Sequence, residues 1–265
     1  MNSNAERFTG FADIYDQARP HLPAFPREVI RRYLGHAPDT VVDLGCGTGL
    51  STAAWIGECR QVIGIEPSAD MLGIAQKKAG EGIRFRQAFA HDTGLADGIA
   101  DAIICSQSFH WMEPVSTLRE VHRLLAPGGV FATVDCDWPP MCGYEAEKAY
   151  QALFAQVRDI ETGHPDIRST FTRWEKEKHL QNIRECGCFA FVRELVFANP
   201  EACDAQRFIQ LALSQGSLQA ILKRHPELIE NALEHFKQMI LAHFGDGKRT
   251  IYFGYRMRVG VKGNE

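Results

Sequence analysis

The chain has 265 residues, of which 45% are hydrophobic, enough for one large core or for a core that carries an appended cap. Acidic residues exceed basic ones by 33 to 29, and no basic run is longer than a pair such as Arg31-Arg32, so a nucleic-acid partner is not expected. Residues 1–10 are polar, and no apolar run approaches the roughly 20 residues that span a bilayer. These features predict a cytoplasmic protein with no membrane partner.

The eight cysteines are scattered, and the chain shows no export signal, so reduced thiols are expected rather than disulfides. The run Cys186-Gly187-Cys188 is the closest approach to a metal motif. Zinc needs about four ligands, and no second Cys/His pair stands at ligand spacing from that run. The sequence therefore predicts no metal.

Between residues 40 and 136, β-rich runs alternate with helical stretches. The expected strands are residues 40–44, 61–66, 83–89, 101–106 and 129–136, and the expected helices are residues 50–57, 68–79 and 114–125. Ser68 is a plausible N-cap for the second of these helices, and Pro127-Gly128-Gly129 marks a turn after the third. Nearly continuous apolar strands are typical of parallel strands buried on both faces. The alternation predicts a doubly wound, mostly parallel α/β sheet.

After Trp138 the pattern changes to long helical segments interrupted by two strand-like runs. The expected helices are residues 145–160, 168–185, 204–213 and 226–244, and the expected strands are residues 189–197 and 250–261. The last strand alternates in polarity, which favours an antiparallel position. We therefore expect a cofactor lid and α/β core over residues 1–137. Residues 138–265 are expected to supply a helical cap, the substrate region and the last strands.

A glycine-rich loop, Gly45-Cys46-Gly47-Thr48-Gly49, follows the first strand and leads into a helix near Leu50. Glycines there allow a sharp turn and a close approach of backbone N–H groups to a ligand. A dinucleotide fingerprint would need glycine where Leu50 stands, and no Gly-Lys-Ser/Thr follows for a phosphate loop. A purely structural turn is the alternative reading.

Glu66 ends the second strand, seventeen residues after Gly49. A carboxylate at this position can accept hydrogen bonds from two adjacent ribose hydroxyls, which suits an adenosine ligand with a free diol. The alternative is an exposed acid at a strand end.

At these residues the chain resembles the class I, seven-stranded Rossmann-like S-adenosylmethionine methyltransferases. The resemblance covers roughly residues 8–136 and is carried by residues 41–49, 65–68, 101–104 and 124–129. Residues 11–16 with Arg19-Pro20, and residues 106–111, resemble a small-molecule branch that includes trans-aconitate methyltransferase-like proteins. The resemblance implies S-adenosyl-L-methionine as cofactor, S-adenosyl-L-homocysteine as product and a small-molecule methyl acceptor as partner.

The resemblance also implies roles for individual residues. The loop glycines would flank the methionyl and ribose groups, Glu66 would hold the ribose, and Arg19 would pair with the methionyl carboxylate. Phe89 stands where a polar contact to adenine is common. The residues expected to contact the cofactor are Tyr15, Arg19, Asp43, Gly45, Cys46, Gly47, Thr48, Gly49, Glu66, Pro67, Met71, Ala90, His91, Ser106 and Gln107.

Methyl transfer from a sulfonium needs mainly alignment and exclusion of water, and a base only if the acceptor must lose a proton. His110, which follows the fourth strand, is the candidate catalytic base; a hydrogen-bonded imidazole packed over the cofactor is the alternative. Phe109, Trp111 and Trp138 are the candidate substrate contacts.

Four arginines could serve an acidic acceptor, namely Arg168, Arg173, Arg256 and Arg258. A non-catalytic S-adenosylmethionine-binding sensor or assembly protein is the rival function. A nicotinamide-dependent dehydrogenase is disfavoured by Leu50.

Overall fold

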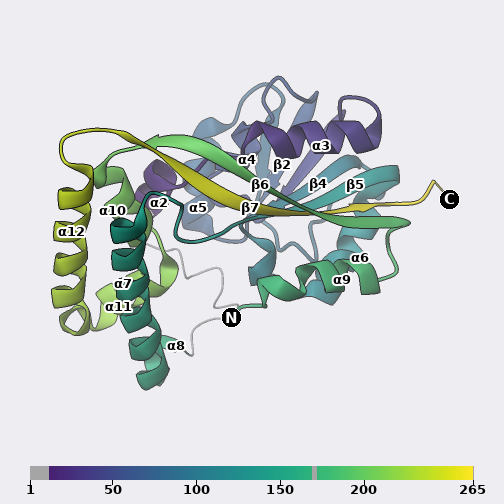
Figure 1. Ribbon diagram of the computed structural model, residues 1–265. Coiled ribbons are helices and arrows are strands. Elements are labelled where there is room, and N and C mark those ends of the chain that lie inside the picture. The colour runs from purple at the N-terminus through teal and green to yellow at the C-terminus, as the bar shows by residue number, and fades with distance from the viewer. Residues whose placement is uncertain (1–11, 169–171, 265) are drawn as a thin grey trace. The chain divides into compact units, whose positions relative to one another are not determined.

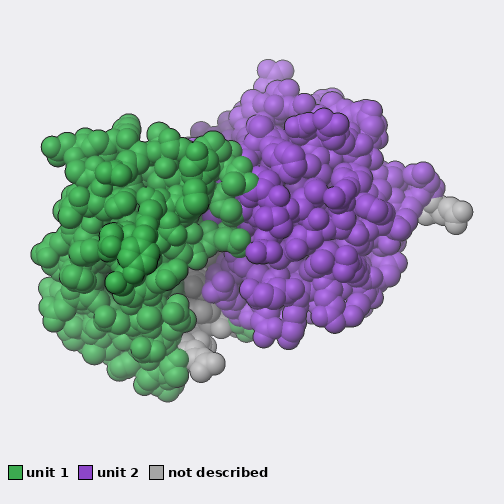
Figure 2. All heavy atoms as spheres, in the orientation of Figure 1, with its two compact units in different colours: residues 1–20, 137–172, 198–254 green, residues 21–136, 173–197, 255–265 purple. Residues whose placement is uncertain are grey.

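A computed structural model of the chain describes residues 12–168 and 172–264, without the side chains of residues 12–14 and 168 (Figure 1). The chain divides into two compact units (Figure 2). The sheet unit comprises residues 21–136, 173–197 and 255–265, and the helical unit comprises residues 1–20, 137–172 and 198–254. One unit boundary lies between residues 136 and 137, and residues 173–197 and 255–265 group with the sheet. The expected division into residues 1–137 and 138–265 stays a prediction.

Seven strands form one sheet in the order β3-β2-β1-β4-β5-β7-β6. The strands are β1 (Thr40–Leu44), β2 (Gln61–Ile65), β3 (Ile83–Arg86), β4 (Ala100–Ser106), β5 (Leu125–Cys136), β6 (Phe191–Cys203) and β7 (Arg249–Val261). The first five are parallel to one another, and β7 runs antiparallel to β5. The predicted doubly wound, mostly parallel fold and the antiparallel last strand are therefore confirmed.

Helices flank both sides of the sheet. These helices are α3 (Ala24–Leu34), α4 (Leu50–Ala53), α5 (Ala69–Ala75), α6 (Pro114–Leu124) and α9 (His179–Glu185). Figure 1 shows α3 on one side of the sheet and α6 and α9 on the other. Apolar strand residues such as Val42 and Phe131 form one buried cluster with Val121 of α6 and Ile183 of α9. β1 is buried along its whole length, as its continuous apolar run predicts.

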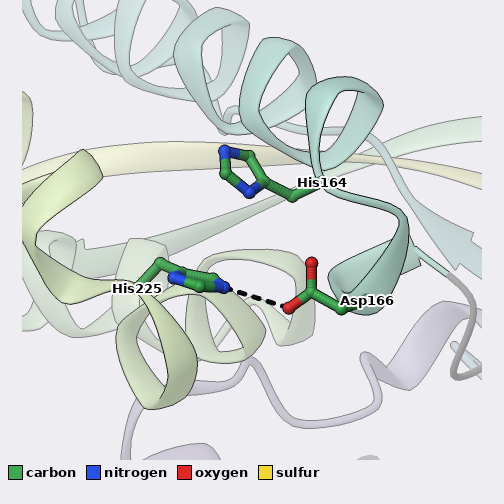
Figure 3. A group of neighbouring side chains, drawn as sticks. All are labelled: His164, Asp166 and His225. Atoms are coloured by element: carbon green, nitrogen blue, oxygen red, sulfur yellow. Dashed lines mark hydrogen bonds and ion pairs between the residues drawn. The ribbon is translucent and has the colours of Figure 1, made fainter.

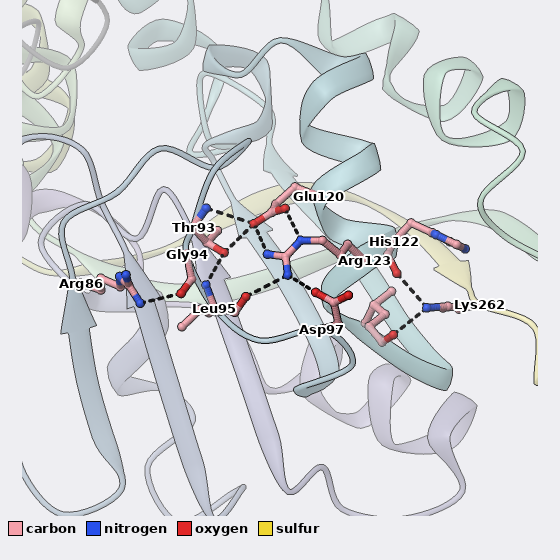
Figure 4. A network of polar contacts seen from close by, with 10 residues as sticks. Arg86, Thr93, Gly94, Leu95, Asp97, Glu120, His122, Arg123 and Lys262 are labelled. Carbon is pink, nitrogen blue, oxygen red and sulfur yellow. Dashed lines mark hydrogen bonds and ion pairs between the residues drawn. The ribbon is translucent and has the colours of Figure 1, made fainter.

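A network around Arg123 ties α6 to the segment between β3 and β4 (Figure 4). Arg123 donates to both carboxylate oxygens of Glu120, to the Leu95 carbonyl oxygen at 2.9 Å and to Asp97. Glu120 also accepts from the Thr93 backbone N–H at 3.0 Å and from its hydroxyl at 2.6 Å. Burial alone would raise the pKa of Glu120, but the hydrogen bonds from Arg123 and Thr93 outweigh it and lower that pKa to about 2.

Replacing Glu120 with glutamine is expected to lower the free energy of unfolding at pH 7 by about 2 kcal/mol, because it leaves the guanidinium of Arg123 partly unpaired. The pKa is depressed in the folded state, so this stabilisation is present above the unfolded pKa of about 4.3 and is lost as the pH falls toward 2. Urea unfolding at pH 7 and at pH 3.5 measures the difference between parent and variant. If the parent and the variant differed in unfolding free energy by the same amount at both pH values, the ionised Glu120 would not be the source of the stabilisation.

The helical unit contains six described helices. They are α2 (Ala12–Ala18), α7 (Tyr144–Gly163), α8 (Pro165–Arg168), α10 (Ala205–Leu213), α11 (Gly216–Arg224) and α12 (Glu230–Phe244). Aromatic rings form much of its core: the Tyr150 ring on α7 lies edge-on to Phe208 of α10 and Phe236 of α12, each at 6.2 Å between centroids. No helix in the described ranges is both long and apolar enough to cross a membrane.

One expectation about the helices was wrong, and one helix was not predicted. Residues 168–185 do not form one helix: α8 ends at Arg168, and α9 begins only at His179 after a 3₁₀ turn, Lys176–Lys178. Glu175, the residue before that turn, has an extended backbone, and the Trp174 N–H donates to the His110 carbonyl oxygen at 2.8 Å. A tertiary hydrogen bond has thus replaced a helical one. Helix α11, residues Gly216–Arg224, was not predicted.

Candidate functional site

The glycine loop lies at the carboxyl end of β1, next to the end of β2. Gly45, Gly47 and Gly49 all have positive φ angles, of 67°, 56° and 83°. The N–H groups of Gly45 and Cys46 both donate to the Ile65 carbonyl oxygen, which holds the loop against β2. A Cβ atom on Gly47 would meet nothing within 4 Å, whereas one on Gly49 would lie 2.9 Å from Phe85. Gly49 is therefore required for packing, and the open space over Gly47 lets another molecule approach the backbone.

Glu66 is buried beside this loop, with 7% of its surface exposed. Its Oε2 accepts from the Gly47 N–H and its Oε1 from the Ser68 N–H, each at 2.9 Å. Burial raises the pKa of Glu66 to about 7, with these two hydrogen bonds opposing the rise and the charge of Asp43 adding to it. The alternative of an exposed strand-end acid is wrong. Because each carboxylate oxygen has further acceptor capacity, Glu66 can still receive hydroxyl donors.

Asp43 lies beneath the loop and is fully buried. Its Oδ2 accepts from the hydroxyls of Ser51 and Thr52 at 2.6 and 2.7 Å, which joins β1 to α4. Burial raises the pKa of Asp43 to about 6, against these two hydrogen bonds. Asp43 Oδ1 and the Thr48 hydroxyl are buried without a hydrogen-bond partner. Two buried carboxyl groups with spare acceptor capacity fit a cationic ligand rich in hydroxyl groups.

The residues expected beside adenine lie on the segments that follow β2 and β3. The Ser68 side chain caps α5 as predicted, accepting from the Met71 N–H, and Met71 is 2% exposed. His91 is exposed, and its ring stacks on Phe89 at 5.6 Å between centroids. Ala90 is buried next to it. The expected contacts of Pro67, Met71, Ala90 and His91 with adenine stay predictions.

Gln107 follows β4 with a φ of 56°, the only non-glycine residue in the described ranges with a positive φ. Its N–H donates to the Val134 carbonyl oxygen at 2.9 Å, while its Nε2 is buried without a partner. Left-handed backbone at a residue other than glycine is uncommon and is concentrated at functional sites. Ser106, the last residue of β4, pairs with Val134 in the sheet. Both residues therefore lie at the carboxyl edge of the sheet.

The segment after Gln107 packs directly on the glycine loop. The Ser108 hydroxyl donates to the Leu44 carbonyl oxygen at 2.7 Å. A Cβ atom on Gly45 would come within 2.7 Å of both Ser108 and Met112, so glycine is needed there for the two segments to meet. Phe109 is 1% exposed and lies edge-on to Phe131, so it belongs to the core and has almost no surface for a substrate.

His110 lies on this segment and is 5% exposed. Its Nδ1 is 3.6 Å from Oδ1 of Asp135, and neither atom has a hydrogen-bond partner. Burial lowers the pKa of His110 to about 3, although the nearby carboxylate of Asp135 opposes the effect. The imidazole is therefore neutral at physiological pH and has one ring nitrogen able to accept a proton.

Asp135, near the end of β5, is the centre of a buried charge cluster within the sheet unit. Its Oδ2 accepts from Arg258 Nη1 at 2.8 Å and faces His179 Nδ1 at 3.1 Å, and its Oδ1 is 3.2 Å from Lys176 Nζ. Burial alone would raise the pKa of Asp135, but interactions with His110, His179 and Lys176 hold it well below its usual range. Asp135 is therefore a permanent carboxylate 3.6 Å from the imidazole of His110.

Sequence reasoning missed Asp135, Lys176 and His179. A signal for Asp135 was present, because an acid near the carboxyl end of an otherwise apolar buried strand needs buried partners. Arg258 was expected as a possible counter-ion for an acidic acceptor, and the structure corrects this: it is 3% exposed and bonds to both Asp135 and Glu194. β7 pairs Arg258 with Thr133, which places Arg258 diagonally across from Asp135 on one sheet face.

The other expected arginines have different surroundings. The Arg173 guanidinium lies 5.8 Å from the centroid of the Trp111 ring, the expected substrate contact. Arg256 is exposed on β7, and the side chain of Arg168 falls outside the described residues, as does the stretch 8–11 of the family resemblance.

Three further expected site residues lie together in the helical unit. The Arg19 guanidinium is 4.8 Å from the centroids of both the Tyr15 and Trp138 rings. It also donates to the Ser214 hydroxyl at 2.9 Å and to the Ser214 carbonyl oxygen at 3.0 Å. The expected roles of Tyr15 and Arg19 toward a cofactor, and of Trp138 toward a substrate, stay predictions.

Residues 42–133 match the methyltransferase domain family. An uncharacterized methyltransferase of Mycobacterium tuberculosis is 31% identical over 43% of this chain and 46% of its own length. A probable S-adenosylmethionine-dependent methyltransferase of Saccharomyces cerevisiae is 32% identical over 44% of this chain and 43% of its own. A ubiquinone/menaquinone biosynthesis C-methyltransferase of Rubrivivax gelatinosus is 30% identical over 43% of this chain and 45% of its own length. The matches thus span about half the length of these relatives, and they indicate a methyltransferase domain at residues 42–133.

Solved structures share the fold. A candidate type II methyltransferase from Anaeromyxobacter dehalogenans superposes with a TM-score of 0.67 at 21% identity, covering 93% of this chain and 99% of its own. Geranyl diphosphate C-methyltransferase from Streptomyces coelicolor, in complex with S-adenosyl-L-homocysteine, superposes with a TM-score of 0.50 at 17% identity. The superposition covers 90% of this chain and 76% of that enzyme. These structures support the seven-stranded Rossmann-like fold.

Proposed function

We propose that the protein is an S-adenosylmethionine-dependent methyltransferase that acts on a small-molecule acceptor. The observation that carries the proposal is the buried carboxylate of Glu66, bonded to the N–H of Gly47 at the point where the glycine loop is open. The methyltransferase domain match over residues 42–133 contains both residues. The narrower resemblance to trans-aconitate methyltransferase-like proteins and a cytoplasmic location stay predictions within this proposal.

The loop and its two acids would hold the cofactor. Glu66 would accept the ribose hydroxyls, and the open backbone at Gly47 would let the cofactor lie close to the loop. Asp43, with one unpaired carboxylate oxygen, would contribute negative charge near a cationic ligand. When bound, S-adenosylmethionine supplies a methyl group made electrophilic by the sulfonium. Neighbouring proteins whose names include the cofactor or its product support this choice.

We infer that the acceptor is small and must lose a proton. The quinone-pathway relative and the geranyl diphosphate enzyme support a small acceptor. His110 is neutral and lies on the segment packed against the loop. A closer approach of the Asp135 carboxylate would raise the pKa of His110 from about 3 and make it a stronger base for the acceptor's proton. The carboxylate of Asp135 would stabilise the resulting imidazolium. The distance of 3.6 Å between His110 Nδ1 and Asp135 Oδ1 can shorten when substrates bind, because catalytic hydrogen bonds tighten in bound complexes.

A carboxylate acceptor is the second candidate, favoured by one observation. Lys176 is the cation of the Asp135 cluster whose side chain retains 18% exposure, so it could also face an acidic group. Such an acceptor needs no base.

The activity can be tested directly. The purified chain is incubated with methyl-labelled S-adenosylmethionine and fractionated small-molecule extracts, and labelled products are identified by mass spectrometry. The proposal expects a labelled small molecule that forms only with the intact protein. Cofactor binding without turnover across a broad panel of hydroxyl, amine, carbon-acid and carboxylate acceptors would instead favour the non-catalytic binding protein.

The raised pKa of Glu66 predicts a pH dependence of cofactor binding. Ribose hydroxyls donate to the ionised carboxylate, so cofactor binding competes with protonation of Glu66. The pKa of Glu66 in the ligand-free protein is about 7. The dissociation constant of S-adenosylhomocysteine should therefore rise as the pH falls below 7, by at most about tenfold per pH unit for one proton. Calorimetric titrations from pH 5.5 to 8 measure this.

The matched control is Glu66→Gln, which cannot titrate. It should retain only the weaker dependence near pH 6 that Asp43 contributes. The same pH profile in parent and variant would show that Glu66 does not govern binding.

A further inference from the structure

Three helix ends in the helical unit bring a nitrogen and oxygen ligand set together (Figure 3). His164 follows the last residue of α7, Asp166 lies in α8, and His225 follows the last residue of α11. One ligand atom from each residue lies within 4.8 Å of the other two. In Figure 3 the two imidazole rings and the carboxylate border a common space.

We propose that His164, Asp166 and His225 bind a zinc ion. Two imidazole nitrogens and one carboxylate oxygen are ligand types that zinc takes, with water completing a tetrahedral site. In such a site the ligand oxygen and nitrogen atoms stand about 3.3 Å apart, given metal–ligand distances of about 2.0 Å. The Asp166 Oδ2 and His225 Nε2 atoms are already 3.0 Å apart, so that pair is close to the required spacing.

An outer carboxylate prepares His225 for this role. The Nδ1 atom of His225 lies 3.6 Å from Glu227 Oε1, on the opposite side of the ring from Asp166. In the metal-free protein the Nε2–H group of His225 donates to Asp166. When zinc displaces this proton, the proton that remains on Nδ1 faces Glu227 and Nε2 coordinates the metal. Metal-bound histidines commonly donate their other ring N–H to a carboxylate in this way.

A simple Asp166–His225 ion pair does not account for the third residue. The His164 ring centroid is 5.1 Å from that of His225, although His164 takes no part in the Asp166–His225 hydrogen bond. Asp166 is exposed, and an aspartate carboxylate is ionised at neutral pH, so Asp166 is able to coordinate a metal ion. The Arg224 guanidinium bonds to the Asp166 backbone oxygen, and the carboxylates of Asp166 and Glu227 flank the His225 ring.

A zinc ion at this position would link the ends of α7, α8 and α11. It would therefore stabilise the folded protein in proportion to its occupancy. The effect needs neither cofactor nor acceptor. The inference is thus independent of the proposed methyl transfer.

The test uses the full chain, stripped with a chelator and titrated with zinc chloride. We expect the parent to bind one more zinc equivalent than His164→Ala or His225→Ala, and zinc to raise the melting temperature of the parent but not of these variants. Glu227→Gln should weaken binding about tenfold or more. His235→Ala, an exposed histidine on α12, is the matched control and should bind zinc like the parent.

Thiols are the main competitor, because all eight cysteines are free. Cobalt(II) distinguishes them, since a site of nitrogen and oxygen ligands lacks the strong thiolate-to-metal bands. Asp166→Asn, which leaves both histidines in place, guards against misfolding of the alanine variants and should also lose the site. Equal zinc stoichiometry in the parent and all three ligand variants, thiolate bands in the cobalt form, or no binding by the parent would each overturn the proposal.

Discussion

Replacing His110 with alanine is expected to slow methyl transfer in a single turnover by about a hundredfold or more, while the affinity for S-adenosylmethionine stays within a fewfold of the parent value. The reason is that a positioned general base typically contributes this much when the acceptor must lose a proton. His110 lies on the segment that contacts the glycine loop, and its Nδ1 faces Asp135 rather than an exposed surface. Rapid-quench measurements with the acceptor found in the labelling screen give the rate.

The control for this substitution is His122→Ala, an exposed histidine on α6, which should leave the rate unchanged. Thermal unfolding of both variants shows whether the cavity left by the buried imidazole has weakened the fold. A His110→Ala enzyme that folds and transfers the methyl group at the parent rate would rule out the base. That result would point to a carboxylate acceptor, with the partly exposed Lys176 as its candidate counter-ion.

Replacing Glu66 with alanine is expected to weaken S-adenosylmethionine binding roughly ten- to a hundredfold, because loss of a charge-assisted contact costs about 1.5 to 3 kcal/mol. The substitution also frees the Gly47 N–H, so the loop loses a hydrogen bond that holds its open face. Glu66→Gln keeps one acceptor oxygen and should lose less affinity. Isothermal titration calorimetry measures both variants.

Glu81→Ala, an exposed acid between α5 and β3, is the matched control and should bind like the parent. A folded Glu66→Ala protein with parent affinity would show that the ribose is held elsewhere.

Local sequence patterns were enough to predict most of the sheet unit. The apolar run Val41-Val42-Asp43-Leu44 shows a strand buried on both faces, and it is buried throughout. Ser68 caps α5 through its own side chain, a contact that depends only on neighbours in the chain. The alternating pattern of the last strand correctly indicated its antiparallel pairing. These features are encoded within short stretches of sequence.

Features that depend on distant partners could not be read in the same way. The chain before α9 is held by a hydrogen bond between Trp174 and His110, sixty-four positions apart. β5 begins at Leu125 rather than at residue 129 because Leu125 already pairs with Ala100 before a shift in register reaches Val130. A single strand pattern does not reveal such pairings.

The charge cluster and the proposed zinc site show the same limit for functional residues. Asp135 gathers partners from three other segments, through His110, Lys176 and Arg258. The proposed zinc ligands are His164, Asp166 and His225. The third is about sixty residues away in the sequence, so no short sequence motif contains all three. The expectation of no metal considered only the cysteine run, whereas the candidate ligands are brought together by the packing of helix ends.

The most direct test of the proposed function is a calorimetric titration of dialysed protein with S-adenosylmethionine, with NAD as the control ligand. The glycine loop, the buried Glu66 and the Leu50 that interrupts a dinucleotide fingerprint together predict saturable binding of S-adenosylmethionine at one site per chain and no binding of NAD. Tight binding of NAD with no signal from S-adenosylmethionine would contradict the proposal.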